Sequence, residues 1–90
     1  MAIAIAKIKI MPSSPQADLK KIKEDAIKVI EKTGAKLHSS EEQEIAFGLK
    51  ALILTITLEE EKGTDKMENA LSKISNVNSV QVIDFRRAIG

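Results

Sequence analysis

Residues 44–52 place a phenylalanine, Phe47, where the hydropathy pattern predicts the tip of a loop. Phe47 is one of only two aromatic residues in the chain. An aromatic ring that a small domain leaves unburied is typical of an anchor that fills a pocket on a partner protein. Gly48 lets the backbone turn tightly or approach another surface closely. The chemistry that this segment offers is therefore binding, and the alternative is that Phe47 folds back onto the domain as part of its core.

Side chains suited to covalent catalysis or metal binding are few. The single histidine, His38, has no second histidine and no cysteine to complete a metal site, so we expect it on the surface of an edge strand. The absence of cysteine also removes thiolate nucleophiles and disulfides. The acidic residues 59–61 are typical of a solvated turn, and no nucleophile elbow or phosphate-binding glycine loop occurs. We expect neither an enzyme nor a bound metal or cofactor.

The charge balance indicates a partner that is recognised locally. The net charge of +1 creates no overall field that would attract nucleic acid. Arginine occurs only at Arg86 and Arg87, which makes this adjacent pair distinctive. No apolar run approaches the roughly 20 residues that span a bilayer. We expect a soluble protein with no direct nucleic-acid or membrane partner, and the lack of cysteine is compatible with a reducing, cytoplasmic setting.

Hydrophobic periodicity predicts four strands and two helices. Near the start, small and branched apolar residues alternate with Lys7 and Lys9, which indicates a strand with one buried face. Ser14 followed by Pro15 fits a helix N-cap with proline in the first turn. The predicted elements are a strand (4–10), a helix (16–33), an edge strand (35–43), a loop (45–48), a central strand (49–58), a turn (59–63), a helix (65–75) opened by an Asp65 and Glu68 capping box, and a last strand (79–85).

The order β-α-β-β-α-β predicts an α+β fold, the ferredoxin-like sandwich. Its four-stranded antiparallel sheet has the strand order 4-1-3-2, and both helices cover one face. The length fits a single domain, residues 1–90. Because many unrelated functions share this fold, the fold does not identify a function.

Two other functions are compatible with the same topology. An RNA-binding domain would stack bases on aromatic residues of the central strands, but these strands supply only Ile, Ala, Leu, Lys and Thr. A small-molecule-sensing regulatory domain would bind its ligand near residues 11–14, and this alternative stays open.

Four blocks of sequence, residues 8–12, 45–52, 63–65 and 82–87, occur in an order that is more specific than any one of them. In these blocks, and over essentially the whole chain, the sequence resembles the archaeal elongation factor 1-beta family and the C-terminal domain of the eukaryotic family. This resemblance implies a guanine-nucleotide exchange factor of translation elongation. The implied partner is the GTPase elongation factor 1-alpha, from which GDP is released so that GTP can rebind, without covalent chemistry.

The resemblance also implies which residues contact the GTPase. Phe47 matches the loop aromatic that packs into the nucleotide-binding domain of elongation factor 1-alpha. Its block carries small residues around the ring and a lysine after it, here Ala46, Gly48 and Lys50.

In the eukaryotic family a lysine beside the C-terminus enters the magnesium site. Aligning Phe85 with the apolar residue two places before that lysine puts Arg87 at its position. The arginine is a departure from the family, because a planar guanidinium is bulkier than an ammonium group, and Arg86 is the alternative.

Two predictions about geometry follow. Phe47 is expected to be exposed in the free protein, because an anchor must be available before a partner buries it. Phe47 and residues 86–87 are expected at the same end of the sheet, as one bipartite site, because the third strand is expected to run antiparallel to the fourth.

Overall fold

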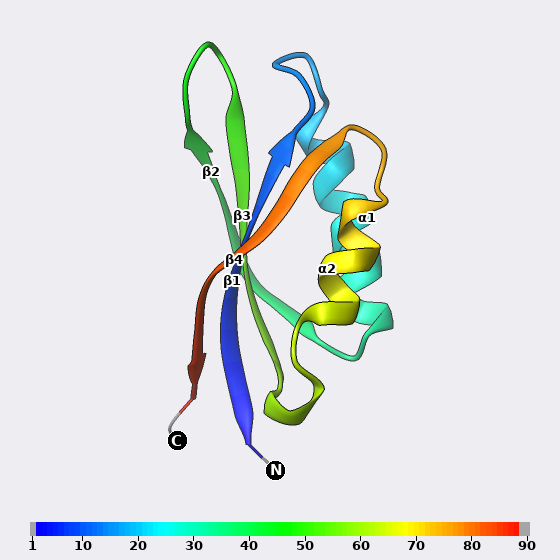
Figure 1. The fold of residues 1–90 in the computed structure, drawn as a ribbon, viewed down its shortest axis with the longest axis vertical. Helices are drawn as coiled ribbons and strands as arrows, with labels where there is room; N and C mark the ends of the chain where they lie inside the picture. Colours follow the sequence, from blue (N-terminus) through cyan, green and yellow to red (C-terminus); the bar gives the residue numbers. More distant parts are fainter. Residues whose placement is uncertain (1, 89–90) are drawn as a thin grey trace.

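Four antiparallel strands form one sheet in the order β2-β3-β1-β4, which confirms the predicted topology (Figure 1). The computed structural model describes residues 2–88. Its elements are β1 (Ile3–Pro12), α1 (Leu19–Lys32), β2 (Lys36–Glu44), β3 (Lys50–Glu59), the 3-10 turn η1 (Glu60–Lys62), α2 (Asp65–Ser72) and β4 (Val77–Arg87). Both helices cover the same face of the sheet, so the α+β ferredoxin-like sandwich is also confirmed.

The core lies between the helices and the two central strands. Alternate residues of β1 point toward the helices and are fully buried, and each pairs with a buried residue of β3. These pairs are Ala4 with Leu58, Ala6 with Ile56, Ile8 with Leu54 and Ile10 with Leu52. The helices add Ile22, Ala26 and Ile30 from α1, and Met67 and Leu71 from α2. The two-residue period of the strands therefore determines which face of the sheet is buried beneath the helices.

The first helix begins later than the sequence pattern predicts. Its N-cap is Asp18, whose carboxylate accepts hydrogen bonds from the backbone N–H groups of Lys20 (3.0 Å) and Lys21 (3.4 Å). Ser14 instead starts a tight turn, in which its carbonyl accepts from the backbone N–H of Ala17 at 3.2 Å. The Ser14 and Pro15 cap is therefore wrong, because a carboxylate nearer the helix satisfies its free N–H groups.

We expect Asp18→Ala to lower the free energy of unfolding by about 1 kcal/mol, the usual value of a side-chain N-cap. Urea unfolding followed by circular dichroism measures this change. Ser14→Ala is the matched control and should stay within about 0.5 kcal/mol of the parent chain. A larger loss in Ser14→Ala than in Asp18→Ala would restore the earlier helix start.

The later elements differ from prediction mainly at their ends. The second helix is capped by Thr64 rather than Asp65, and the Thr64 hydroxyl donates to the Glu68 carboxylate at 2.9 Å. This helix ends at Ser72 instead of residue 75, whereas β4 extends the predicted strand 79–85 at both ends.

No helix within residues 2–88 has the length and apolar character needed to cross a membrane.

Candidate functional site

The tip of the β2–β3 hairpin holds Phe47 in an unusual backbone conformation. A β-turn spans residues 46–49 and is closed by a hydrogen bond from the backbone N–H of Leu49 to the carbonyl of Ala46 at 2.9 Å. Both central residues have positive φ, 53° at Phe47 and 80° at Gly48. This is the pattern of a type I′ turn, in which asparagine followed by glycine is the preferred pair. Phenylalanine therefore stands where the turn itself favours another residue.

The ring of Phe47 contributes little to the fold. The residue is 96% exposed, which confirms the predicted exposure and contradicts the alternative that Phe47 fills the core. A non-glycine residue in the left-handed region costs roughly 1–2 kcal/mol. An exposed ring does not recover that cost by burial, so the conformation points to a role outside folding.

Three loops gather around this end of the sheet (Figure 1). A Cβ atom added to Gly48 would lie 3.8 Å from the Cβ of Pro15, so the hairpin tip lies close to the loop between β1 and α1. That loop is joined to the loop before β4 by a 2.8 Å hydrogen bond from the backbone N–H of Ser13 to the carbonyl of Asn76. Ala46, Gly48 and Lys50 are exposed beside Phe47. These exposed residues therefore surround Phe47 at the hairpin tip.

A small hollow lies between the hairpin tip and the loop after β1. Its volume is about 160 Å³, and Ser14 and Lys50 are among its lining residues. It adjoins residues 11–14, where a regulatory ligand would be expected to bind. Small-molecule sites usually occupy 300–1,000 Å³ and contain a few polar anchors. No polar or charged side chain is buried in the described part of the chain, which weighs against the ligand-sensing alternative.

At the other end of the sheet, a β-bulge determines where the two arginines point. Val82 pairs with Ile8 and Asp84 pairs with Lys7, so Ile83 is the extra residue of β4. The strand alternation shifts by one residue at such a bulge. Arg86 and Arg87 are consecutive strand residues and so point to opposite faces of the sheet, and the bulge sets which face each one takes.

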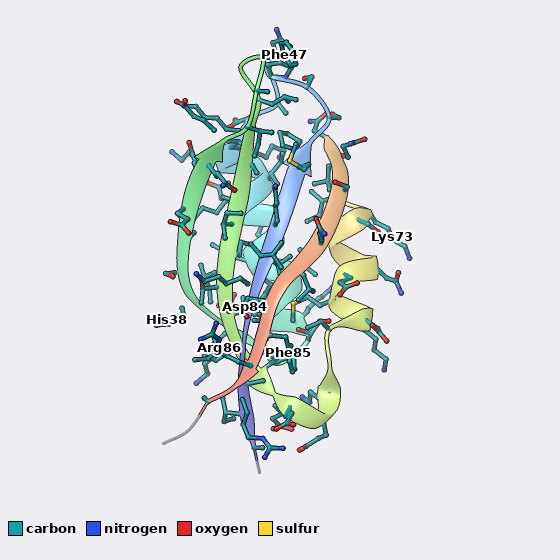
Figure 2. The ribbon with its side chains drawn as sticks, turned by 60° about the vertical axis from the view of Figure 1, so that its left-hand side comes forward. His38, Phe47, Lys73, Asp84, Phe85 and Arg86 are labelled. Atoms are coloured by element: carbon teal, nitrogen blue, oxygen red, sulfur yellow. The ribbon has the colours of Figure 1, made fainter. Side chains whose placement is uncertain are left out.

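The cross-strand partners identify the two faces. Arg87 pairs with Ala4, whose side chain is buried beneath the helices, whereas Arg86 pairs with Ile5 on the open face. Figure 2 shows Phe85 on the α2 side of β4, and Asp84 and Arg86 on the other side. The two arginines are therefore not interchangeable, because a partner that covers one face meets only one of them.

Both arginines have carboxylate partners. On the open face, Arg86 Nη2 lies 2.9 Å from an oxygen of Asp84. On the helix side, the guanidinium of Arg87 donates two hydrogen bonds to Glu60, from Nε at 2.7 Å and from Nη2 at 2.9 Å. The hydrogen bonds that Arg87 donates to Glu60 lower the pKa of the Glu60 carboxylate and raise the pKa of Arg87. Both groups of this second pair are therefore charged at neutral pH.

Phe47 and the arginines lie at opposite ends of the sheet, so the prediction of a single bipartite site is wrong. Strands β3 and β4 are both antiparallel to β1 and are therefore parallel to each other. Arg87 lies opposite Ala4, whereas Leu52, near the start of β3, lies opposite Ile10, six residues further along β1. Six strand residues span about 20 Å, and Phe47 lies beyond that point. The domain is 41 Å long, which accommodates this separation.

Two features of the arginine end are not apparent from the sequence pattern. Glu60 lies in an acidic run typical of a solvated turn, and the bulge at Ile83 leaves no clear signal in an alternating strand.

His38 is exposed on β2 as predicted (Figure 2). Within residues 2–88, no three potential metal ligands come together.

Comparison with known proteins gives one family and a widely shared fold. The sequence model of the EF-1 guanine nucleotide exchange domain matches residues 5–88. Elongation factor 1-beta of Methanosarcina barkeri is 49% identical over 89 residues, which cover 97% of this chain and 99% of that protein. Elongation factor 1-beta of Methanocaldococcus jannaschii is 42% identical, with 98% and 100% covered.

The similar solved structures are distant in sequence. The ACT domain from GTP pyrophosphokinase of Chlorobium tepidum superimposes with a TM-score of 0.63 at 16% identity, over 88% of this chain and 96% of that one. A de novo designed protein, Foldit4, also gives 0.63, at 10% identity and with 98% of each chain covered. At such identities the likeness shows the fold alone.

Proposed function

This chain belongs to the EF-1 guanine nucleotide exchange domain family, and on that premise we propose that it releases GDP from elongation factor 1-alpha so that GTP can rebind. It is a guanine-nucleotide exchange factor of translation elongation, and exchange makes or breaks no covalent bond. We propose that residues 1–90 form the exchange domain and act in the cytoplasm. Phe47, Ala46, Gly48 and Lys50 would contact the GTPase at one end, and Arg87, or Arg86 as the alternative, would contact it at the other.

The physical basis of exchange is thermodynamic linkage. A factor that binds the nucleotide-free GTPase more tightly than the loaded form must weaken nucleotide affinity by the same factor. Binding energy from the contact surface is thereby converted into release of GDP. A cation near the magnesium site would add to this effect by competing with the ion that bridges the phosphates.

The observation that supports the proposal most directly is the geometry of Phe47. Its ring is exposed and its backbone has positive φ, so it is presented to a partner before binding. A rigid turn limits the ordering cost that a flexible loop would add on association. Such a ring, packed into the GTPase, would hold nearby elements in the arrangement of the nucleotide-free state.

The separation of the two ends constrains how the GTPase binds. A partner that contacts both Phe47 and Arg87 must extend along most of the 41 Å long axis of the domain. If Arg87 is the functional cation, the partner must also approach from the helix side at the arginine end, because Arg87 projects from that side. The proposed interface thus consists of two separate areas of this domain that contact the same GTPase molecule.

Stopped-flow fluorescence tests the proposed function directly. The release of fluorescent GDP from purified elongation factor 1-alpha would be followed with and without this chain. We expect release to be accelerated in a concentration-dependent way that saturates as the complex forms. No acceleration at micromolar concentrations would contradict the proposal, and an unrelated ferredoxin-like domain serves as the control for nonspecific effects.

A further inference from the structure

Glu60 occupies a distinctive position next to the proposed cation. Its two carboxylate oxygens each accept one hydrogen bond from the guanidinium of Arg87, at 2.7 and 2.9 Å. The two residues are 27 positions apart in the sequence, so only the fold brings them together. A bidentate pair fixes the plane of the guanidinium as well as its distance.

The backbone on both sides of this pair is also fixed. The N–H of Glu60 donates to the carbonyl of Ala2 at 2.9 Å, which ties η1 to the start of the sheet. The N–H of Ala88 donates to the carbonyl of Ile3 at 2.8 Å, which extends β4 along the same part of β1. Glu60 and Arg87 therefore project from two segments that are bonded to one strand end.

The pairing leaves part of the guanidinium free to bind. Arginine has five N–H donors, and Glu60 takes one from Nε and one from Nη2. The other donors, two on Nη1 and one on Nη2, make no hydrogen bond to the protein in the described part of the chain. The side chain of Arg87 is 66% exposed, so these donors face solvent and are available to an acidic or phosphate group of a partner.

We infer that Glu60 is a positioning residue that holds the guanidinium of Arg87 in the orientation in which it meets the GTPase. This inference rests on the proposed function, because it requires that Arg87 contacts the GTPase. Without Glu60, the arginine side chain would sample many rotamers in the free protein. Ordering it in the complex would then cost conformational entropy and weaken binding to the GTPase. Glu60 itself makes no contact with the nucleotide in this scheme.

The test compares variants of the full chain in the GDP-release assay at subsaturating concentration. Glu60→Ala is expected to slow release about fivefold, the upper range for loss of an exposed pair. Glu60→Gln keeps one acceptor oxygen and should fall between Glu60→Ala and the parent chain. Glu61→Ala removes an exposed neighbouring carboxylate and should leave the rate unchanged. Equal rates in Glu60→Ala and the parent chain would overturn the inference.

A double-mutant cycle separates positioning from a general structural role. If Glu60 acts through Arg87, then Glu60→Ala should have no further effect in the Arg87→Ala background. Because Glu60 would act through Arg87, chelation of magnesium should change the defects of Glu60→Ala and Arg87→Ala in the same direction. An unchanged fivefold defect in the Arg87→Ala background would overturn the inference and assign Glu60 another role.

The charge-reversed pair gives an independent check. Combining Glu60→Arg with Arg87→Glu retains an ion pair between η1 and β4 but removes the cation from position 87. We expect this variant to unfold at the same temperature as the parent chain and to exchange no faster than Arg87→Ala. Parental exchange by this variant would overturn the inference.

Failure of the inference and failure of the proposed function remain distinguishable. If Arg87→Ala slows release while Glu60→Ala does not, the inference fails and the exchange function stands. If neither the parent chain nor any variant accelerates release, the proposed function itself fails.

Discussion

Replacing Phe47 with alanine is expected to reduce the stimulated rate of GDP release about 30-fold or more at a subsaturating concentration of this chain. This is the effect of losing an aromatic hot spot that contributes about 2 kcal/mol to binding. The fold should be unaffected, because Phe47 is 96% exposed and therefore makes little contact with the domain. Stopped-flow release assays and thermal unfolding measure the two effects. Phe85→Ala is the comparison for the loss of an aromatic ring at the opposite end of the sheet, where Phe85 shares the face of Arg87.

The backbone conformation at Phe47 allows the role of the ring to be separated from that of the turn. Asparagine is better suited than phenylalanine to a φ of 53°, so Phe47→Asn should be at least as stable as the parent chain. It should nevertheless lose exchange to the same extent as Phe47→Ala. A stable, fully active Phe47→Asn variant would show that the ring is not an anchor and that the turn alone suffices.

Replacing Arg87 with alanine is expected to slow GDP release about tenfold, equivalent to 1.4 kcal/mol of lost stabilisation. Thermal stability should change little, because Arg87 is exposed and solvent screens its ion pair with Glu60. Arg87→Lys restores the residue type of the eukaryotic family and should recover part of the rate. Arg86→Ala is the control, because Arg86 points to the other face of the sheet.

Magnesium distinguishes two possible roles of Arg87. If its cation displaces the bound ion, the defect of Arg87→Ala should shrink when magnesium is chelated, because the ion is then already gone. If it only docks the GTPase, the defect should be equal with and without magnesium and should depend more strongly on salt. A normal rate in Arg87→Ala combined with a slow Arg86→Ala would move the contact to the open face of the sheet.

The distance between the two ends gives a further check on this pair of predictions. Mutations more than about 10 Å apart with no shared partners usually have additive free energies. Phe47→Ala and Arg87→Ala should therefore multiply in their effects on the rate. Strong non-additivity would mean that the two ends are coupled through the GTPase.

Local sequence patterns were sufficient for much of this protein. The alternation around Lys7 and Lys9 predicts β1, and helical spacing predicts both helices, because these periods come from the backbone geometry of each element alone. The position of Phe47 before a glycine, between two predicted strands, predicts an exposed loop aromatic. The strand order also implied that β3 and β4 are parallel, since both are antiparallel to the strand between them. The single bipartite site followed from treating them as antiparallel.

Only the tertiary structure decided how the arginines are arranged. The bulge at Ile83 shifts the alternation of β4 by one residue, and the period-two hydrophobic pattern does not predict such a shift. Glu60 reaches Arg87 only because η1 and the end of β4 both lie against the start of β1. The positive φ of Phe47 likewise depends on closing the β2–β3 hairpin. Sequence periodicity reports contacts a few residues apart, whereas these features depend on the pairing of distant segments, which the folded sheet alone specifies.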